Sequence, residues 1–107
     1  FLMDFLSEIR SSLLKHKAIV FPNQELSPEQ LVELSLQFGG IGEDPFFGHI
    51  EGRRQLTAIQ RASDEQTSIF AEAFHSDWSF LEVSLSAEAQ YGAKIPSVGG
   101  TQSPLIN

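Results

Sequence analysis

The chain has 107 residues, which is the size of one modest domain and too short for a large barrel surrounded by helices. Hydrophobic residues make up 41% of it and charged residues 20%, an ordinary globular balance that argues against a disordered or collagen-like class. The 14 acidic residues outnumber the 7 basic ones, and the resulting net charge of -7 opposes binding to nucleic acid.

The absence of cysteine and the hydropathy of the sequence further narrow the possible classes of protein. The sequence has no cysteine, so histidine and carboxylate side chains would have to hold any metal ion. No apolar run approaches the roughly 18 residues needed to cross a bilayer, and residues 1–10 lack a basic segment before their apolar positions. We therefore expect a cytoplasmic protein with no membrane partner.

Two helices are expected in the first 40 residues. Large apolar side chains recur at spacings of three and four from residue 2 to residue 14, which predicts an amphipathic helix over residues 3–17. A second helix should follow Ser27, because Ser27 and Gln30 form a capping box and Pro28 suits a first turn. The pair Gly39-Gly40 should end this helix, whose inner face is expected to carry Leu31, Leu34 and Phe38.

Extended segments are expected around and after the second helix. Residues 18–21 form a short apolar run, rich in β-branched and aromatic side chains, that is stopped by Pro22 and Asn23, which predicts a buried core strand. The segment 41–52 should be a loop or hairpin, and the polar segment 61–68 a surface loop. Three more strands are predicted, over residues 56–59, 74–80 and 89–95.

The segment FHSDWSF, residues 74–80, places an imidazole and a carboxylate two positions apart. Because side chains alternate along a strand, His75 and Asp77 are expected to project from one face and to hold one cation. Two histidines and one carboxylate form the facial triad that suits non-haem Fe(II). The alternative interpretation of this short motif is a surface strand with a local hydrogen bond between His75 and Asp77.

The blocks KAIVFPNQELSPEQLVELSLQFG, FHSDWSFLE and YGAKIPSVGGT occur in this order. Together they resemble the taurine dioxygenase and dichlorophenoxyacetate dioxygenase family of 2-oxoglutarate-dependent oxygenases, over roughly residues 7–101. The resemblance implies an α+β fold: a partial double-stranded β-helix, jelly-roll or cupin-like, with N-terminal helices packed on the sheet. It also implies that residues 1–107 are a single domain, the truncated N-terminal portion of a dioxygenase domain.

For activity, the resemblance implies an Fe(II) enzyme that converts 2-oxoglutarate to succinate and CO2 while hydroxylating a small organic substrate. His75 and Asp77 match the family's first two iron ligands. Thr101 matches the threonine that binds the 2-oxoglutarate carboxylate, although the acid of the family's Gly-Gly-Asp-Thr segment is missing before it. The distal histidine ligand and the arginine that anchors 2-oxoglutarate are absent from these residues, so the chain is expected to be inactive alone.

The resemblance disfavours taurine itself as the substrate. Taurine-specific members carry His and Tyr where this chain has Asp44 and Phe47, and Asn where it has Ala71. Phe47 and Phe80 are candidates for an apolar substrate pocket, and core packing is the alternative for both.

Three neighbouring features also have two interpretations each. His49 is either a loop histidine or a residue facing the site. Arg53 and Arg54 either bind an anion or are simply solvated, and Trp78 either gates the site or packs in the core.

Two further functions remain open at the level of the whole chain. The first is a non-enzymatic relic that acts as a self-associating or binding module, because a half barrel leaves strand edges and apolar surface uncovered. A homo-oligomer, most simply a dimer that exchanges strands, is therefore an expected partner. The second is an unrelated small α+β domain.

Overall fold

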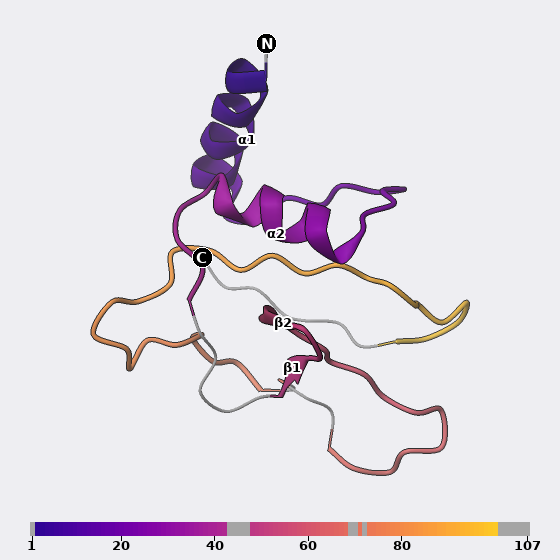
Figure 1. The fold of residues 1–107 in the computed structure, drawn as a ribbon. Helices are drawn as coiled ribbons and strands as arrows, with labels where there is room; N and C mark the ends of the chain where they lie inside the picture. The colour runs from indigo at the N-terminus through magenta and orange to yellow at the C-terminus, as the bar shows by residue number, and fades with distance from the viewer. Residues whose placement is uncertain (1, 43–47, 69–70, 72, 101–107) are drawn as a thin grey trace. The chain divides into compact units, whose positions relative to one another are not determined.

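The computed structural model describes residues 2–42, 48–68, 71 and 73–100. Within these residues the chain forms two α-helices followed by a two-stranded antiparallel sheet, in the order α1, α2, β1, β2 (Figure 1). The chain divides into two compact units, residues 1–41 and residues 42–106. The α+β class is thus present, whereas the described residues contain no jelly roll. Packing of the helices on a sheet stays a prediction.

Helix α1 spans Leu2–His16, within one residue of the predicted bounds at each end. Leu6 and Ile9 lie almost one turn apart on its inner face, and each is only 8% exposed. The helix ends where Lys17 adopts a φ of 69°, the left-handed conformation that commonly closes helices. The helical prediction from apolar spacing is confirmed.

Helix α2 spans Pro28–Leu36 and begins with the predicted capping box. The backbone N–H of Gln30 donates to Ser27 Oγ at 3.2 Å, and the Ser27 N–H donates to Gln30 Oε1 at 2.8 Å. Two N–H groups at the helix start are thereby satisfied. Beyond Leu36, Gly39 has a φ of 141°, so the glycine pair ends the helix as expected. The predicted inner residues are all half-buried: Leu31, Leu34 and Phe38.

One arginine connects the two helices within the first unit. The guanidinium of Arg10 on α1 donates a hydrogen bond to the carbonyl of Gln37, just after α2. The same group lies 5.9 Å from the centre of the Phe38 ring, in a cation–π arrangement. These contacts join the middle of α1 to the end of α2.

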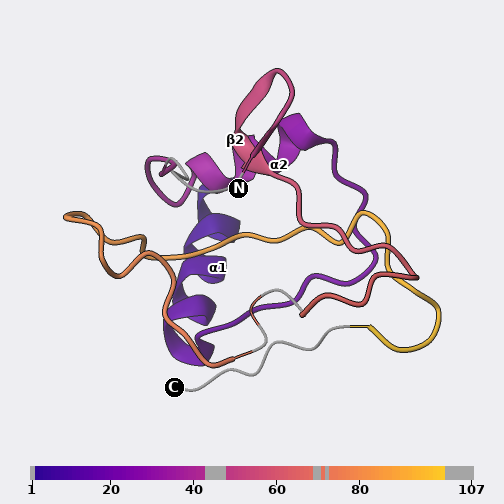
Figure 2. The same ribbon diagram turned by 90° about the horizontal axis from the view of Figure 1, so that it is seen from below.

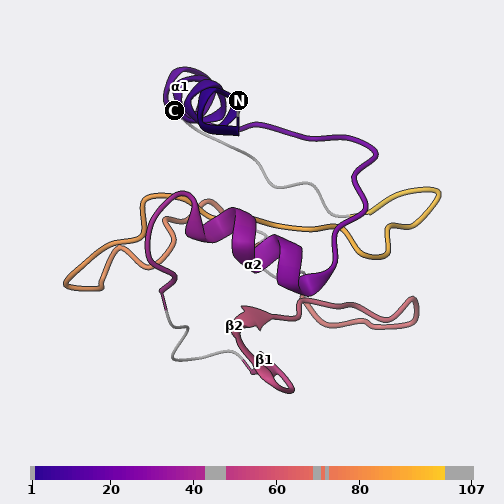
Figure 3. The same cartoon turned by 45° about the horizontal axis from the view of Figure 1, so that its top comes forward.

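The predicted core strand over residues 18–21 is wrong. The connection between α1 and α2 is coil in all three views (Figures 1, 2 and 3). Val20 is 84% exposed and Phe21 is 47% exposed, so the segment is not a core element either. β-Branched residues favour strands only when a neighbouring strand supplies hydrogen bonds and packing. None of the described residues pairs with this segment.

Strands β1 (His49–Ile50) and β2 (Arg53–Thr57) form an antiparallel hairpin. Its two-residue turn ends in Gly52, whose φ of 74° is a conformation that glycine adopts without steric cost. The hairpin falls partly in the predicted loop at 41–52. The predicted strand at 56–59 is shifted, because β2 starts earlier and leaves Ile59 outside, 59% exposed.

Residues 73–100 form bends and turns, and no strand occurs among them (Figures 1 and 2). The predicted strands at 74–80 and 89–95 are therefore wrong for the same reason as the first, since a strand needs a partner. Among the residues described here, no helix combines the length and apolarity required to traverse a bilayer.

Candidate metal centre

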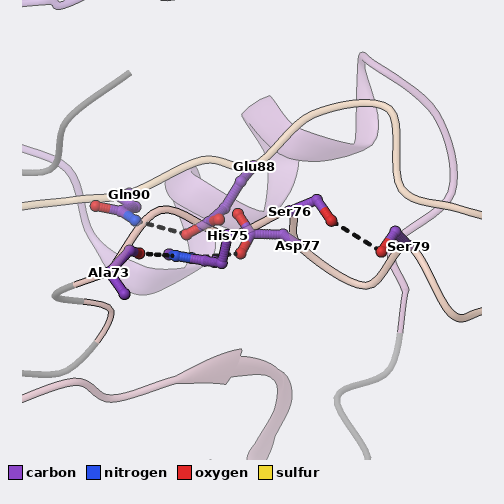
Figure 4. A network of polar contacts seen from close by, with 7 residues as sticks. All are labelled: Ala73, His75, Ser76, Asp77, Ser79, Glu88 and Gln90. Atoms are coloured by element: carbon purple, nitrogen blue, oxygen red, sulfur yellow. Dashed lines mark hydrogen bonds and ion pairs between the residues drawn. The ribbon is translucent and has the colours of Figure 1, made fainter. Parts of the chain in front are cut away.

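His75 and Asp77 lie against each other, with 3.0 Å between His75 Nε2 and Asp77 Oδ1 (Figure 4). Their side chains are 47% and 48% exposed, so both are accessible to a dissolved ion. Sequence reasoning expected them together because strand side chains alternate. The segment is bent rather than extended, so local contacts bring the two groups together instead.

The first of these contacts orients the imidazole. His75 Nδ1 lies 2.7 Å from the carbonyl oxygen of Ala73, close enough for Nδ1–H to donate. In the neutral ring this hydrogen bond leaves the lone pair on Nε2, the atom that faces Asp77. Metal-ligating histidines commonly donate their other N–H to a backbone carbonyl in this way. The tautomer that the contact selects is the one a metal requires.

The same contacts favour the protonated form of the ring. The Ala73 carbonyl is the largest influence that raises the pKa of His75, and the charge of Asp77 acts in the same direction. Partial desolvation opposes both. Binding of a cation at Nε2 must therefore displace a proton that the site favours.

A short turn follows the pair. The hydroxyl groups of Ser76 and Ser79 are 2.9 Å apart, and the Leu81 N–H donates to the Trp78 carbonyl at 3.1 Å. Trp78 itself has a φ of 51°. Asp77 therefore lies inside the loop that the Ser76–Ser79 contact closes, and a second turn, from Trp78 to Leu81, follows it.

Glu88 and Gln90 are the site residues that sequence reasoning missed. The Gln90 amide donates to Glu88 Oε1 at 2.6 Å, and the Glu88 carboxyl points toward the pair (Figure 4). Burial of this carboxyl raises the pKa of Glu88, and Asp77 adds to the effect, although the residue as a whole is exposed. The only sequence signal was their spacing of two, which is typical of one face of an extended segment.

The structure describes only some of the remaining sequence candidates. Phe80 is 66% exposed and lies edge-on to Trp78, with ring centres 5.6 Å apart. Phe47 and Thr101 lie outside the described residues, as does Asp44. His49 is an exposed residue of β1 in the hairpin.

The donor set fits one part of an iron site. An imidazole nitrogen and a carboxylate oxygen are donors that non-haem Fe(II) accepts. Across residues 2–42, 48–68, 71 and 73–100, no group of three or more His, Asp or Glu side chains is arranged to hold a metal ion. The three histidines of the sequence are His16, His49 and His75, so none follows Asp77.

The chain also matches a model of a known protein family. The family model for "Taurine catabolism dioxygenase TauD, TfdA family" matches residues 3–103, nearly the entire chain. The chain therefore belongs to the TauD/TfdA dioxygenase family. No solved structure matches it.

Proposed function

We propose that this chain supplies the first two metal ligands of an Fe(II)- and 2-oxoglutarate-dependent oxygenase, through His75 Nε2 and Asp77 Oδ1. The observation that carries the proposal is the 3.0 Å approach of these two atoms together with the hydrogen bond from Nδ1 to Ala73. Membership of an oxygenase family supports the choice of iron over other divalent ions.

Each side chain has a separate task in this proposal. Asp77 contributes negative charge, and His75 contributes a neutral nitrogen whose direction is set by Ala73. Fe(II) bound there would offer open coordination positions to 2-oxoglutarate and O2. The overall reaction consumes 2-oxoglutarate, O2 and a substrate C–H bond, and it yields succinate, CO2 and the hydroxylated product.

The proposed site needs more than this pair. A third ligand, a histidine in the family pattern, would have to come from a segment outside these 107 residues, and so would the arginine that anchors 2-oxoglutarate. Thr101 is proposed to bind a 2-oxoglutarate carboxylate, and Phe47 and Phe80 to contact a small organic substrate. The 107-residue chain alone should therefore bind a cation weakly and turn over little or no 2-oxoglutarate.

The test combines binding and turnover on the full chain, without a histidine tag. Anaerobic calorimetry with Fe(II) should detect binding that Asp77→Ala abolishes. Addition of 2-oxoglutarate and O2 should then yield little succinate above a protein-free control. Brisk succinate formation would show that a complete ligand set exists within the chain, and absence of cation binding would contradict the proposal itself.

Self-association is a second candidate function, favoured by exposed apolar side chains. On helix α1, Met3 is 76% exposed, Phe5 54% and Leu14 74%, so apolar side chains on this helix are available for association. We propose that a second copy of the chain covers such surface in a homodimer.

Light scattering coupled to size exclusion measures the mass directly. A dimer of the 11.9 kDa chain supports self-association, and a monomer at high concentration would exclude it. Replacement of Leu14 by Gln should shift the equilibrium toward monomer, while Ser11→Ala on the same helix should not.

A further inference from the structure

We propose that Trp78 is a positioning residue for the His75–Asp77 pair. Its left-handed backbone conformation keeps the Asp77 carboxylate beside His75. The inference rests on the proposed cation-binding function of the pair. It assigns a role to a residue that would not itself touch the ion.

The backbone of Trp78 is in a conformation that its side chain disfavours. Its φ is 51°, and a non-glycine residue pays a steric penalty there because Cβ crowds the following backbone. Such strain persists only where surrounding contacts hold it, and it clusters at functional sites. Trp78 is the bulkiest described residue with positive φ, and it directly follows a candidate ligand.

Three contacts hold the strained conformation. The Leu81 N–H donates to the Trp78 carbonyl at 3.1 Å, and the Ser76 and Ser79 hydroxyls approach to 2.9 Å. The indole ring meets the Phe80 ring edge-on at 5.6 Å and is half-buried, whereas both serines are exposed. The serine contact closes the chain around Asp77, and the other two contacts hold Trp78 to the residues that follow it.

The closure has a direct effect on the carboxylate. Ser76, which precedes Asp77, is hydrogen-bonded across the loop to Ser79 (Figure 4). Trp78, which follows Asp77, forms the bend through its positive φ. Its backbone therefore cannot rotate freely away from His75. If residue 78 returned to an extended conformation, the Ser76–Ser79 contact would open and the 3.0 Å approach of Asp77 to His75 would no longer be enforced.

Substitution of Trp78 by glycine or by alanine distinguishes a role of the backbone conformation from a role of the indole ring. Both Trp78→Gly and Trp78→Ala remove the indole, but only glycine adopts positive φ without a penalty. With Co(II) as the calorimetric probe, we expect Trp78→Ala to weaken binding roughly tenfold and Trp78→Gly to stay within about threefold of the unaltered chain. Val83→Ala, at a site 81% exposed and outside the turn, is the matched control and should not change the affinity.

Equal weakening by the two Trp78 variants would overturn the inference, because a role of the ring alone predicts equality. One-bond Cα–Hα coupling constants at residue 78 give a readout without metal, and a negative φ there would also overturn it. Failure of the unaltered chain to bind Co(II) while φ remains positive would instead contradict the proposed function of the pair.

Discussion

The helical unit and the segment that carries His75 and Asp77 are held in place by different kinds of contact. In residues 2–42, apolar spacing and a capping box produce regular helices whose backbone hydrogen bonds are internal to each helix. In residues 73–100, there is no repeating backbone pattern among the described positions, and single hydrogen bonds between near neighbours hold the site. The contrast shows that a histidine and an aspartate two positions apart can be brought together without a sheet.

This difference has an energetic consequence. A helix loses little when one exposed side chain changes, because many bonds support it. The geometry of the pair depends on a few contacts within residues 73–81, so one substitution there should have a large effect on cation binding.

Removal of the imidazole should break the site outright. His75→Ala deletes one of the two candidate donors, so we expect Co(II) affinity to fall by more than about 100-fold. This loss is larger than that typical of removing a residue that only hydrogen-bonds to a metal ligand. Calorimetry measures the change. His49→Ala, an exposed histidine in the hairpin, is the matched control and should leave the affinity unaltered.

Replacement of the turn glycine by alanine should destabilise the β1–β2 hairpin. Gly52 has a φ of 74° and Gly48 does not have positive φ, yet an added Cβ would meet nothing within 4 Å at either position. Gly52→Ala should therefore cost the hairpin about 1–2 kcal/mol of conformational strain, and Gly48→Ala should cost less. Amide hydrogen exchange across β2 reports the difference, and equal effects would count against a conformational origin.

Loss of the helix cap should have a moderate effect on the first unit. Ser27→Ala removes the oxygen that accepts the Gln30 N–H at 3.2 Å, which should cost about 1 kcal/mol of helix stability. Urea unfolding followed by circular dichroism at 222 nm measures it. Ser11→Ala, an exposed serine within α1, should be neutral or slightly stabilising.

The smallest effect concerns the loop that precedes the site. A hydrogen bond from the Thr67 hydroxyl, followed by one from the Ala62 N–H, lowers the pKa of Glu65. Because the folded pKa is below the ordinary value of 4.5, the stabilisation is present above about pH 4.5 and is lost as the pH falls through the folded pKa.

NMR titration of the Glu65 carboxyl carbon measures this shift. Thr67→Val removes the largest cause, so the pKa should move back toward its ordinary value. An unchanged titration in the variant would show that the hydroxyl is not responsible.

Sequence reasoning succeeded where the determinants were local. Ser27, Pro28 and Gln30 define the start of α2 within four positions, and the Gly39-Gly40 pair defines its end. The strands failed at residues 18–21, 74–80 and 89–95, because a strand depends on a partner that local sequence cannot supply. A loop or hairpin was predicted over residues 41–52, but the bounds of its strands, which run on to Thr57, were not.

The same difference between local and non-local determinants applies to the candidate site. His75 and Asp77 were identified from their spacing and from the family blocks, and their side chains do meet. Their mode of approach was not foreseen, because it depends on the carbonyl of Ala73 and on the positive φ of Trp78. Glu88 was missed because it lies eleven positions beyond Asp77 and no motif links the two.

In the proposed site, His75 binds a cation through Nε2 while Nδ1 keeps its proton on the Ala73 carbonyl. Nitrogen-15 NMR of the imidazole rings during titration with Zn(II), a diamagnetic divalent probe, distinguishes the two ring nitrogens. We predict a metal-dependent shift at His75 Nε2, a retained Nδ1–H, and no comparable change at His16 or His49. Coordination through Nδ1, or an equal response of all three histidines, would contradict the account.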